Sequence, residues 1–525
     1  MTAHSSISGS RKAAYANPVL SGFYPDPSVV RAGEYYYLIT SSFEYFPGVP
    51  IFRSRDLFRW EPIGHVLTRR SQIDLRERAS SSGVYASTIR YHAGRFYMIT
   101  TDVRGIGNFY VTAEQAEGPW SDPIRLPYGN IDPSLFFDDD GRAYVTSQNG
   151  EGYDSHIIQY EIDPSDGTIL CEPKVIWRGD DGPWLEGPHL YKIRGRYYLT
   201  AASGGTSFDH RQLVARSDSP YGPFEDKPEP ILTHRGLKDH PVQCLGHADL
   251  IEGLDGRWWS VFLGMRPIEG EYSTLGRETF LAPVRWTEDG WPEIDINEGT
   301  VTEGDFDAAG SPVRIANDLM SKKESDRGSA VYESGFGPEW SFLRDFDASR
   351  YIWNKHKGGV TVIGSAYSLD DEAPAVFACL RQRHKRMELS AVLDYRPQAE
   401  DERAGLAARL NQRAYFFAGL AKLDGRRVLL VEFRNGEHKE RKVIMDLSQE
   451  GEISLRLFAD EKGYGAAYSE DGAHWTDAGL PAPVSALSPE TNGGFTGVCV
   501  GLHACGVEED AQPAFYRSVI YSFTC

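Results

Sequence analysis

The chain has 525 residues, of which 41% are hydrophobic and 25% charged, a composition typical of globular proteins with a sizeable core. This length predicts roughly two to four domains. The formal net charge of −20, from 55 basic and 75 acidic residues, repels phosphate backbones and anionic lipids. It therefore argues against nucleic acid and membrane partners and favours a neutral substrate.

The N-terminal region contains no apolar run of signal-peptide length, and no stretch of ~18 apolar residues occurs in the chain. A cytoplasmic location is predicted, with residues 1–15 as a mobile tail. The six cysteines are dispersed without metal-type C-x₂-C spacing, which predicts buried free thiols in a reducing compartment. They are Cys171, Cys244, Cys379, Cys499, Cys505 and Cys525.

A short phrase recurs five times in the first half of the chain, and each copy is a glycine turn followed by an aromatic, β-branched strand. The copies are "GEYYYLI" at Gly33, "GRFYMIT" at Gly94, "GRAYVTS" at Gly141, "GRYYLTA" at Gly195 and "GRWWSVF" at Gly256. Further strand and turn segments lie between the copies and would complete four strands in each unit. Five such units predict a five-bladed β-propeller over residues 16–305.

The strand before each glycine opens on a polar residue. Equivalent positions of the blades surround one axis in a propeller, so we expect the openers at the mouth of the central channel. Three of the five are carboxylates, and like charges held close together cost stability unless they serve a purpose. The alternative is a set of strand-entry caps bonded to backbone amides. The openers are Asp26, Ser87, Asp132, Glu186 and His247.

Three carboxylates at one channel mouth suit glycoside hydrolysis, which needs one protonated acid and one ionised carboxylate. Glu186 lies in "GPWLEGPHL", where apolar neighbours raise a carboxyl pKa, as the general acid requires. Asp26 stands between two prolines in "FYPDPS", a stiff extended entry that suits the base, although a single Asp-Pro is also an ordinary turn starter. Asp132 in "NIDPSLF" would orient Glu186 and keep its pKa high.

Other residues near the openers suit recognition of a small sugar. Arg277 in "LGRETF" has a planar guanidinium that can bond two ring hydroxyls. Phe43 in "SSFEYFPG" and Tyr85 in "SGVYAST" can wall a pocket for the ring. Taken singly, each of these residues also fits a core or rim position.

The C-terminal part of the chain has a different pattern. Residues 306–335 are polar, with clusters of glycine, serine and charged residues, and this composition predicts a linker or crossover. Regular short strands with turns between them then predict an antiparallel β-sandwich over residues 336–525, so that the whole fold is all-β. The strand segments are 388–396, 405–423, 426–434, 451–460, 464–475, 495–505 and 514–523.

Motifs spread over nearly the whole chain carry a resemblance to a known family. They are "NPVLSGFYPDPS", "FEYFPGVPIFRSRDLFRW", "GNIDPSLFFDDDGR", "EGPHLYKIRGRYYLTAASGGT", "GHADLIE", "LGRETFLAPVRW" and "FTGVCVGL". The sequence resembles glycoside hydrolase family 43, the β-xylosidase and α-L-arabinofuranosidase group. The resemblance implies a five-bladed catalytic propeller followed by a jelly-roll-like sandwich, working by single-displacement inversion.

The resemblance also implies roles for individual residues. Asp26 matches the general base, Glu186 the general acid and Asp132 the residue that tunes and orients the acid. Arg277 matches the hydroxyl-binding arginine and His247 the axial histidine. In part of the family this histidine helps to hold a divalent ion, usually calcium, in the channel. A lone His247 without acidic ligands nearby also fits a hydrogen-bonding residue, so no cofactor is required and no metal ligand is assigned.

Three further matches concern the substrate pocket. Thr206 in "GGT" matches a substrate-contacting position, Phe43 a pocket wall, and Phe495 in "NGGFTG" a sandwich residue that reaches the active-site mouth. "GVYAST" departs from the Val-Trp-Ala-Pro of many relatives, with Tyr85 for tryptophan and Ser87 for proline. This departure leaves xylose and arabinose both open and favours the arabinofuranosidase-containing branch.

The leading hypothesis is an inverting exo-glycosidase that removes terminal α-L-arabinofuranosyl and/or β-D-xylosyl groups from plant cell-wall oligosaccharides. The two catalytic carboxyl groups should then stand roughly 6.5–9.5 Å apart. Two alternatives stay open, a non-catalytic carbohydrate-binding propeller and an endo-acting arabinanase or xylanase with an open cleft. The expected partner is a small oligosaccharide, and the sandwich serves as a pocket lid, a stabilising domain or the interface of a homo-oligomer.

Overall fold

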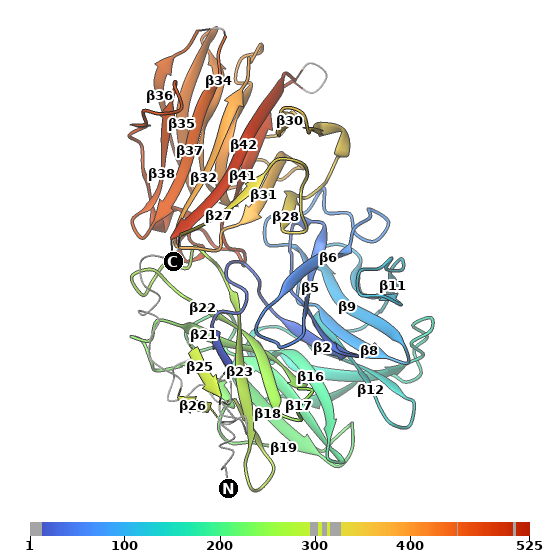
Figure 1. Ribbon diagram of the computed structural model, residues 1–525. Coiled ribbons are helices and arrows are strands. Elements are labelled where there is room, and N and C mark those ends of the chain that lie inside the picture. Colours follow the sequence, from blue (N-terminus) through green and yellow to red (C-terminus); the bar gives the residue numbers. More distant parts are fainter. Residues whose placement is uncertain are drawn as a thin grey trace, which may run out of the picture.

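The computed structural model describes residues 13–294, 303–306, 312–314, 327–448, 450–507 and 511–524. Two domains built almost entirely from strands are stacked on one another, a propeller in blue to green and a sandwich in yellow to red (Figure 1). Most of the predicted N-terminal tail, residues 1–12, lies outside the described residues. Ala13–Ala16 form strand β1, which pairs with β25 (Glu303–Phe306), and β25 pairs with β26 (Pro312–Arg314).

Five antiparallel sheets form the blades of the propeller, as the sequence predicts. The first two blades contain β2 (Ser28–Ala32), β3 (Tyr35–Ile39), β5 (Gly48–Ser54) and β6 (Glu61–Leu67), then β7 (Gly83–Val84), β8 (Thr88–His92), β9 (Arg95–Val103), β10 (Gly107–Ala113) and β11 (Ile124–Arg125). The third contains β12 (Ile131–Phe137), β13 (Ala143–Asn149), β14 (His156–Ile162) and β15 (Lys174–Trp177).

The fourth and fifth blades follow the same pattern of successive strands. The fourth contains β16 (Glu186–Ile193), β17 (Arg196–Ser203), β18 (Arg211–Ser217), β19 (Glu225–Asp226) and β20 (Leu232–Thr233). The fifth contains β21 (Gln243–Glu252), β22 (Trp258–Met265), β23 (Glu278–Trp286) and β24 (Pro292–Ile294).

The inner strands of the blades close into a ring. β2 contacts β8, β8 contacts β12, β12 contacts β16, β16 contacts β21, and β21 contacts β2 again. The strand that pairs with the inner strand of each blade carries one of the five recurring phrases; these strands are β3, β9, β13, β17 and β22. Each phrase begins with a glycine in the left-handed region, with φ between 62° and 86°, a conformation that glycine adopts without steric cost. The turn that the sequence predicts is thus present in all five blades.

The C-terminal domain is a β-sandwich of two antiparallel sheets. The nine-stranded sheet contains β27 (Arg327–Tyr332), β29 (Tyr351–Asn354), β30 (Gly359–Ile363), β32 (Arg386–Asp394), β37 (Ile453–Asp460), β38 (Gly463–Ser469), β39 (Thr476–Asp477), β40 (Ala482–Pro483) and β42 (Pro513–Thr524). The eight-stranded sheet contains β4 (Tyr45–Phe46), β28 (Trp340–Leu343), β31 (Val376–Arg381), β33 (Arg403–Asn411), β34 (Ala414–Leu423), β35 (Arg426–Asn435), β36 (His438–Asp446) and β41 (Cys499–Cys505).

The eight-stranded sheet joins the two domains. Its edge strand β4 comes from blade 1 of the propeller and pairs with β28, with Phe46 opposite Phe342. One face of this sheet packs in the sandwich core, and the other face packs against propeller residues such as Phe23 and Tyr45. Because both faces of this sheet are covered, β41 is buried along its whole length.

The remaining elements are short. The helices are η1 (Gly152–Asp154), η2 (Ala348–Arg350), η3 (Val484–Leu487) and α1 (Pro489–Asn492). Strand β27 begins at Arg327, inside the predicted linker, and residues 307–311 and 315–326 of that linker lie outside the described residues. Five of the six cysteines are described; all five are free thiols, and only Cys171 is partly exposed.

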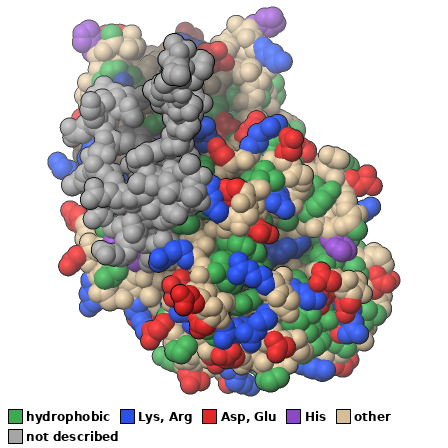
Figure 2. Space-filling model, turned by 60° about the horizontal axis from the view of Figure 1, so that its bottom comes forward, with side chains coloured by type: hydrophobic (Ala, Val, Ile, Leu, Met, Phe, Trp, Pro, Cys, Tyr) green, Lys and Arg blue, Asp and Glu red, His purple; other side chains and the backbone are tan. Residues whose placement is uncertain are grey.

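Charged side chains of both signs cover the face of the molecule that Figure 2 shows. Where the side chains of this face are described, basic ones are scattered among acidic ones. Among the described residues, no helix is long and apolar enough to cross a membrane.

Candidate active site

A cavity of about 620 Å³ opens at the propeller face that meets the sandwich. Inner strands or their entries from all five blades reach it, and a loop of the sandwich completes its wall. The cavity brings together all nine residues that the sequence predicts for the site. They are Asp26, Phe43, Tyr85, Asp132, Glu186, Thr206, His247, Arg277 and Phe495.

Irregular backbone at the entry of the inner strands aims these side chains into the cavity. Asp26 and Asp132 both have φ of 53° and His247 has φ of 51°, and Gly187, next to Glu186, has φ of 58°. The ladders of β12, β16 and β21 are out of register at these same places. Left-handed non-glycine residues cost on the order of 1–3 kcal/mol each and cluster at functional sites.

Asp26 is buried, and each of its two carboxylate oxygens accepts one hydrogen bond. Ser41 Oγ donates to its Oδ2 at 2.5 Å, and Arg277 Nη1 donates to its Oδ1 at 2.6 Å. His247 Nδ1 lies 3.6 Å from the same Oδ1. An ionised carboxylate is acceptor-only, and here both of its oxygens face donors. This arrangement suits a carboxylate that accepts a proton from water.

Asp132 and Glu186 form the second half of the site. Burial raises the pKa of Asp132 to about 6. His247 lowers this pKa, and the negative charge of Asp26 raises it further. Burial also raises the pKa of Glu186 well above its ordinary value, and the charges of Asp132 and Asp26 add to this effect. Glu186 is thus held protonated, as a general acid must be.

Asp132 is also connected to the acid through the backbone. Its Oδ2 accepts a hydrogen bond from the N–H of Gly187 at 3.0 Å, so it fixes the peptide directly after Glu186. No larger residue fits at position 187, because an added Cβ would lie 2.8 Å from His247 Nε2. His247 therefore packs against the peptide that carries the acid and contacts the base on its other side.

Three aromatic rings form one wall of the cavity. The ring centroids of Phe43 and Tyr85 lie 5.1 Å apart, and Phe495 lies 6.0 Å from each of them. The guanidinium of Arg277 lies 5.7 Å from the ring of Phe43 and 5.8 Å from that of Phe495. Apolar sugar faces stack on such walls, while the guanidinium offers donors to hydroxyls.

The aromatic wall depends on a buried ion pair between the domains. Glu44 of blade 1 and Arg409 of β33 are both fully buried, with 3.6 Å between Oε1 and Nη1. Glu44 Oε2 accepts from the N–H of Ser81, and Ser81 Oγ accepts from the N–H of Phe495 at 2.8 Å. The loop that carries Tyr85 is thus bonded to both domains.

The cavity is also lined by residues that no prediction from the sequence singles out. Trp184, two positions before Glu186 in the motif "GPWLEGPHL", lines the cavity with 42% of its surface exposed and a φ of 55°. The exposure of so large an apolar ring at the rim, which only the structure shows, assigns it to the site. Gln148 also lines the cavity, and its buried Oε1 has no partner, so it can accept from a sugar hydroxyl. Arg104 and Glu151 complete the rim, and no sequence motif marks them.

The propeller axis below His247 contains a buried ion pair. Arg90 of blade 2 forms an ion pair with Asp249 of blade 5 at 2.9 Å and bonds to His189 of blade 4 at 3.0 Å. Asp249 also accepts from Ser28 of blade 1 and Tyr191 of blade 4. Asp249 of blade 5 therefore contacts side chains of blades 1, 2 and 4, and it lies in the interior of the ring.

These axial residues do not fit a divalent cation. The guanidinium of Arg90 already supplies a positive charge there, and Ser28, Tyr191 and Arg90 use the oxygens of Asp249. Within the described part of the chain, no group of three or more His, Cys, Asp or Glu side chains is placed to hold a metal ion. His247 itself lies 3.6 Å from Asp26 through its Nδ1, and its possible role toward a metal stays a prediction.

Comparison with known proteins identifies the family. Residues 15–292 match the family model described as glycosyl hydrolases family 43, and residues 332–522 match the model of the beta xylosidase C-terminal concanavalin A-like domain. The chain belongs to glycoside hydrolase family 43. It is therefore a glycosidase, and its all-β architecture of propeller and sandwich is that of the family.

Full-length relatives support this assignment. The chain is 36% identical to a non-reducing end alpha-L-arabinofuranosidase of Bacteroides ovatus, with 94% of this chain and 91% of the relative covered. It is 37% identical to a xylosidase/arabinosidase of Butyrivibrio fibrisolvens, with 93% and 95% covered. The solved structure of Bacteroides ovatus xyloglucan PUL GH43B superposes with a TM-score of 0.88 at 35% identity and covers 98% of this chain and 100% of that one.

Proposed function

We propose that this family 43 enzyme is an inverting exo-glycosidase that releases terminal α-L-arabinofuranosyl and/or β-D-xylosyl groups from plant cell-wall oligosaccharides. The observation that carries the proposal is the convergence of Asp26, Asp132 and Glu186 from three blades on one cavity. The names of the arabinofuranosidase and xylosidase/arabinosidase relatives support the two sugars.

In the proposed mechanism, the sugar lies between the two carboxyl groups. Asp26 accepts a proton from a water molecule, whose oxygen forms a bond to the anomeric carbon. Protonated Glu186 gives its proton to the glycosidic oxygen as the bond between that oxygen and the anomeric carbon breaks. The attack on the opposite face inverts the anomeric configuration. The predicted separation of roughly 6.5–9.5 Å between the carboxyl groups leaves room for that water and stays a prediction.

The aromatic wall supports an exo-acting enzyme. Phe495 of the sandwich closes one side of the cavity together with Phe43 and Tyr85, whereas an endo-acting enzyme needs a cleft open at both ends. The axial Arg90–Asp249 pair supports the prediction that no metal cofactor is required. Small oligosaccharides remain the proposed ligands, and the cytoplasmic location and the oligomeric state stay predictions.

The proposal is tested with 4-nitrophenyl α-L-arabinofuranoside and 4-nitrophenyl β-D-xyloside. We expect the wild type to turn over at least one of them, and the ratio of the two kcat/KM values assigns the sugar. The Asp26→Asn and Glu186→Gln variants should lose on the order of 10²–10⁴-fold in kcat on oligosaccharides. A wild type that binds oligosaccharides without hydrolysing either glycoside would favour the carbohydrate-binding alternative, and internal cleavage products from arabinan or xylan would favour the endo-acting one.

A further inference from the structure

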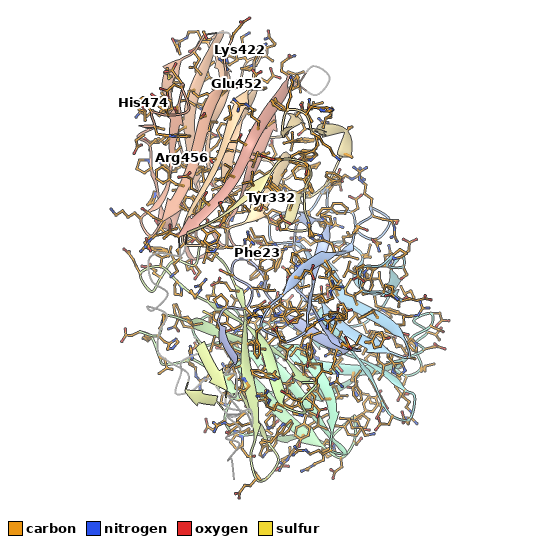
Figure 3. The ribbon with its side chains drawn as sticks, viewed as in Figure 1. Phe23, Tyr332, Lys422, Glu452, Arg456 and His474 are labelled. Atoms are coloured by element: carbon orange, nitrogen blue, oxygen red, sulfur yellow. The ribbon has the colours of Figure 1, made fainter. Side chains whose placement is uncertain are left out.

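The segment that leads into Asp26 lies directly against the sandwich. Ser21 Oγ donates to the carbonyl oxygen of Arg383, just after strand β31. Gly22 has φ of 94°, and a Cβ added there would lie 2.5 Å from the carbonyl oxygen of Gln382. Only glycine allows so close an approach at that φ. Figure 3 shows the next residue, Phe23, where the two domains meet.

Arg381, the last residue of β31, contacts the next two residues of this segment. Its Nη1 donates to the carbonyl oxygen of Phe23. Its guanidinium lies 4.8 Å from the ring centroid of Phe23 and 4.5 Å from that of Tyr24. The sandwich thus reaches to within two residues of Asp26 through one side chain.

The burial of Arg381 is energetically unfavourable by itself. The residue is 3% exposed, and none of the carboxylates in the described parts of the chain forms an ion pair with it. A buried charge without a partner ion costs several kcal/mol, and the two aromatic rings and one carbonyl group offset only part of this cost. An apolar side chain would fill this place at lower cost, so stability alone does not explain an arginine here.

The rest of the segment is held by the propeller. The N–H of Tyr24 donates to the carbonyl oxygen of Arg277 at 3.0 Å, and Thr279 Oγ1 donates to that of Tyr24 at 2.7 Å. The N–H of Ser41 donates to the carbonyl oxygen of Pro25 at 3.2 Å. The carbonyl oxygens of residues 23, 24 and 25 therefore each have a donor, and Arg381 supplies the first of them.

We infer that Arg381 is a positioning residue for the general base, through which the sandwich takes part in catalysis by the propeller. This inference rests on the proposed function, because it assigns Asp26 the role of base. Arg381 fixes the carbonyl group of Phe23 and stacks on the rings of Phe23 and Tyr24. These contacts set the direction in which the chain enters Pro25–Asp26. A displacement of a reacting group by about 1 Å can cost on the order of 10²-fold in rate.

The test compares Arg381→Met with a matched control, Arg427→Met. Arg427 is also 3% exposed and on the same eight-stranded sheet, but it bonds only to sandwich carbonyls, those of Tyr395, Ser448 and Gly451. We expect Arg427→Met to lose thermal stability and Arg381→Met to keep or gain it, and only Arg381→Met to lose roughly 10- to 100-fold in kcat with a much smaller change in KM. Arg381→Lys, which keeps a cationic donor, should recover part of kcat.

Substrates with different leaving groups separate the base from the acid. Dinitrophenyl glycosides need little protonation of the leaving oxygen, so a defect in Glu186 hardly lowers kcat on these substrates. A displaced Asp26 lowers kcat on them as well, because water must still be activated. We expect Arg381→Met to lose kcat by a similar factor on dinitrophenyl glycosides and on oligosaccharides. A kcat equal to that of Arg427→Met, or a loss confined to oligosaccharides, would overturn the inference. A wild type inactive on all glycosides would instead refute the proposed function.

Discussion

Replacement of Asp132 by asparagine should make the protein more stable and less active. Asp132 is 6% exposed, and burial raises its pKa from 3.8 to about 6. A folded-state pKa above the unfolded one means that the native state favours the protonated form. Protonated Asp132 therefore contributes to the free energy of unfolding. This contribution is fully present below about pH 4 and is lost as the pH rises through about 6. A shift of about two pKa units corresponds to about 3 kcal/mol at neutral pH.

Asparagine avoids this cost and keeps the local hydrogen bond. Its side-chain oxygen can accept from the N–H of Gly187 as Oδ2 of Asp132 does. We therefore expect Asp132→Asn to raise the free energy of unfolding by up to about 3 kcal/mol near neutral pH and by much less near pH 4. The loss of the negative charge that raises the pKa of Glu186 should also move the alkaline limb of the pH–rate profile to lower pH.

The assay is urea unfolding of wild type and variant at two pH values, near 4 and near 7. Asp249→Asn is the control. Burial disfavours the charged form of Asp249, but the charge of Arg90 outweighs it and holds the pKa of Asp249 below its ordinary value. Its replacement leaves Arg90 without its ion partner, so this variant should lose stability at neutral pH. A variant Asp132→Asn that is less stable than wild type near pH 7, or equally stabilised at both pH values, would refute the reasoning, as would an unchanged alkaline limb.

Three further outcomes are expected. Glu186→Gln should retain far more activity on dinitrophenyl glycosides than on oligosaccharides, because the better leaving group needs no acid; equal losses on both would contradict its role. Phe495→Ala should raise KM roughly tenfold through lost ring contacts and change the unfolding free energy by less than ~1 kcal/mol, because Phe495 is 42% exposed; normal kinetics would leave it a structural role only. EDTA should leave kcat unchanged, because Arg90 supplies the axial charge; activity restored by a divalent cation after chelation would contradict this.

Much of the fold could be predicted because its signals are local. Each blade repeats a turn at a glycine, such as Gly33 or Gly195, and a short aromatic strand. Since blades are arranged around an axis, the residue that opens each inner strand is placed by the repeat itself. This reasoning brings Asp26, Asp132 and Glu186 to one cavity without any long-range information.

Contacts between distant segments could not be predicted in this way. The pairing of β4 with β28, the ion pair of Glu44 with Arg409 and the stacking of Arg381 on Phe23 each join residues hundreds of positions apart. The left-handed backbone at Asp132 is also invisible in the sequence, since aspartate does not require it. The unrecognised rim residue Trp184 shows the same limit, because its exposure depends on how the surrounding loops pack.

The most direct test of the central claim is the anomeric configuration of the first sugar released, followed by ¹H NMR before mutarotation. Water that Asp26 activates on the face opposite Glu186 must yield the anomer opposite to that of the bond cleaved. Release of the same anomer as in the substrate would mean a covalent intermediate on one of the carboxylates and would contradict the account.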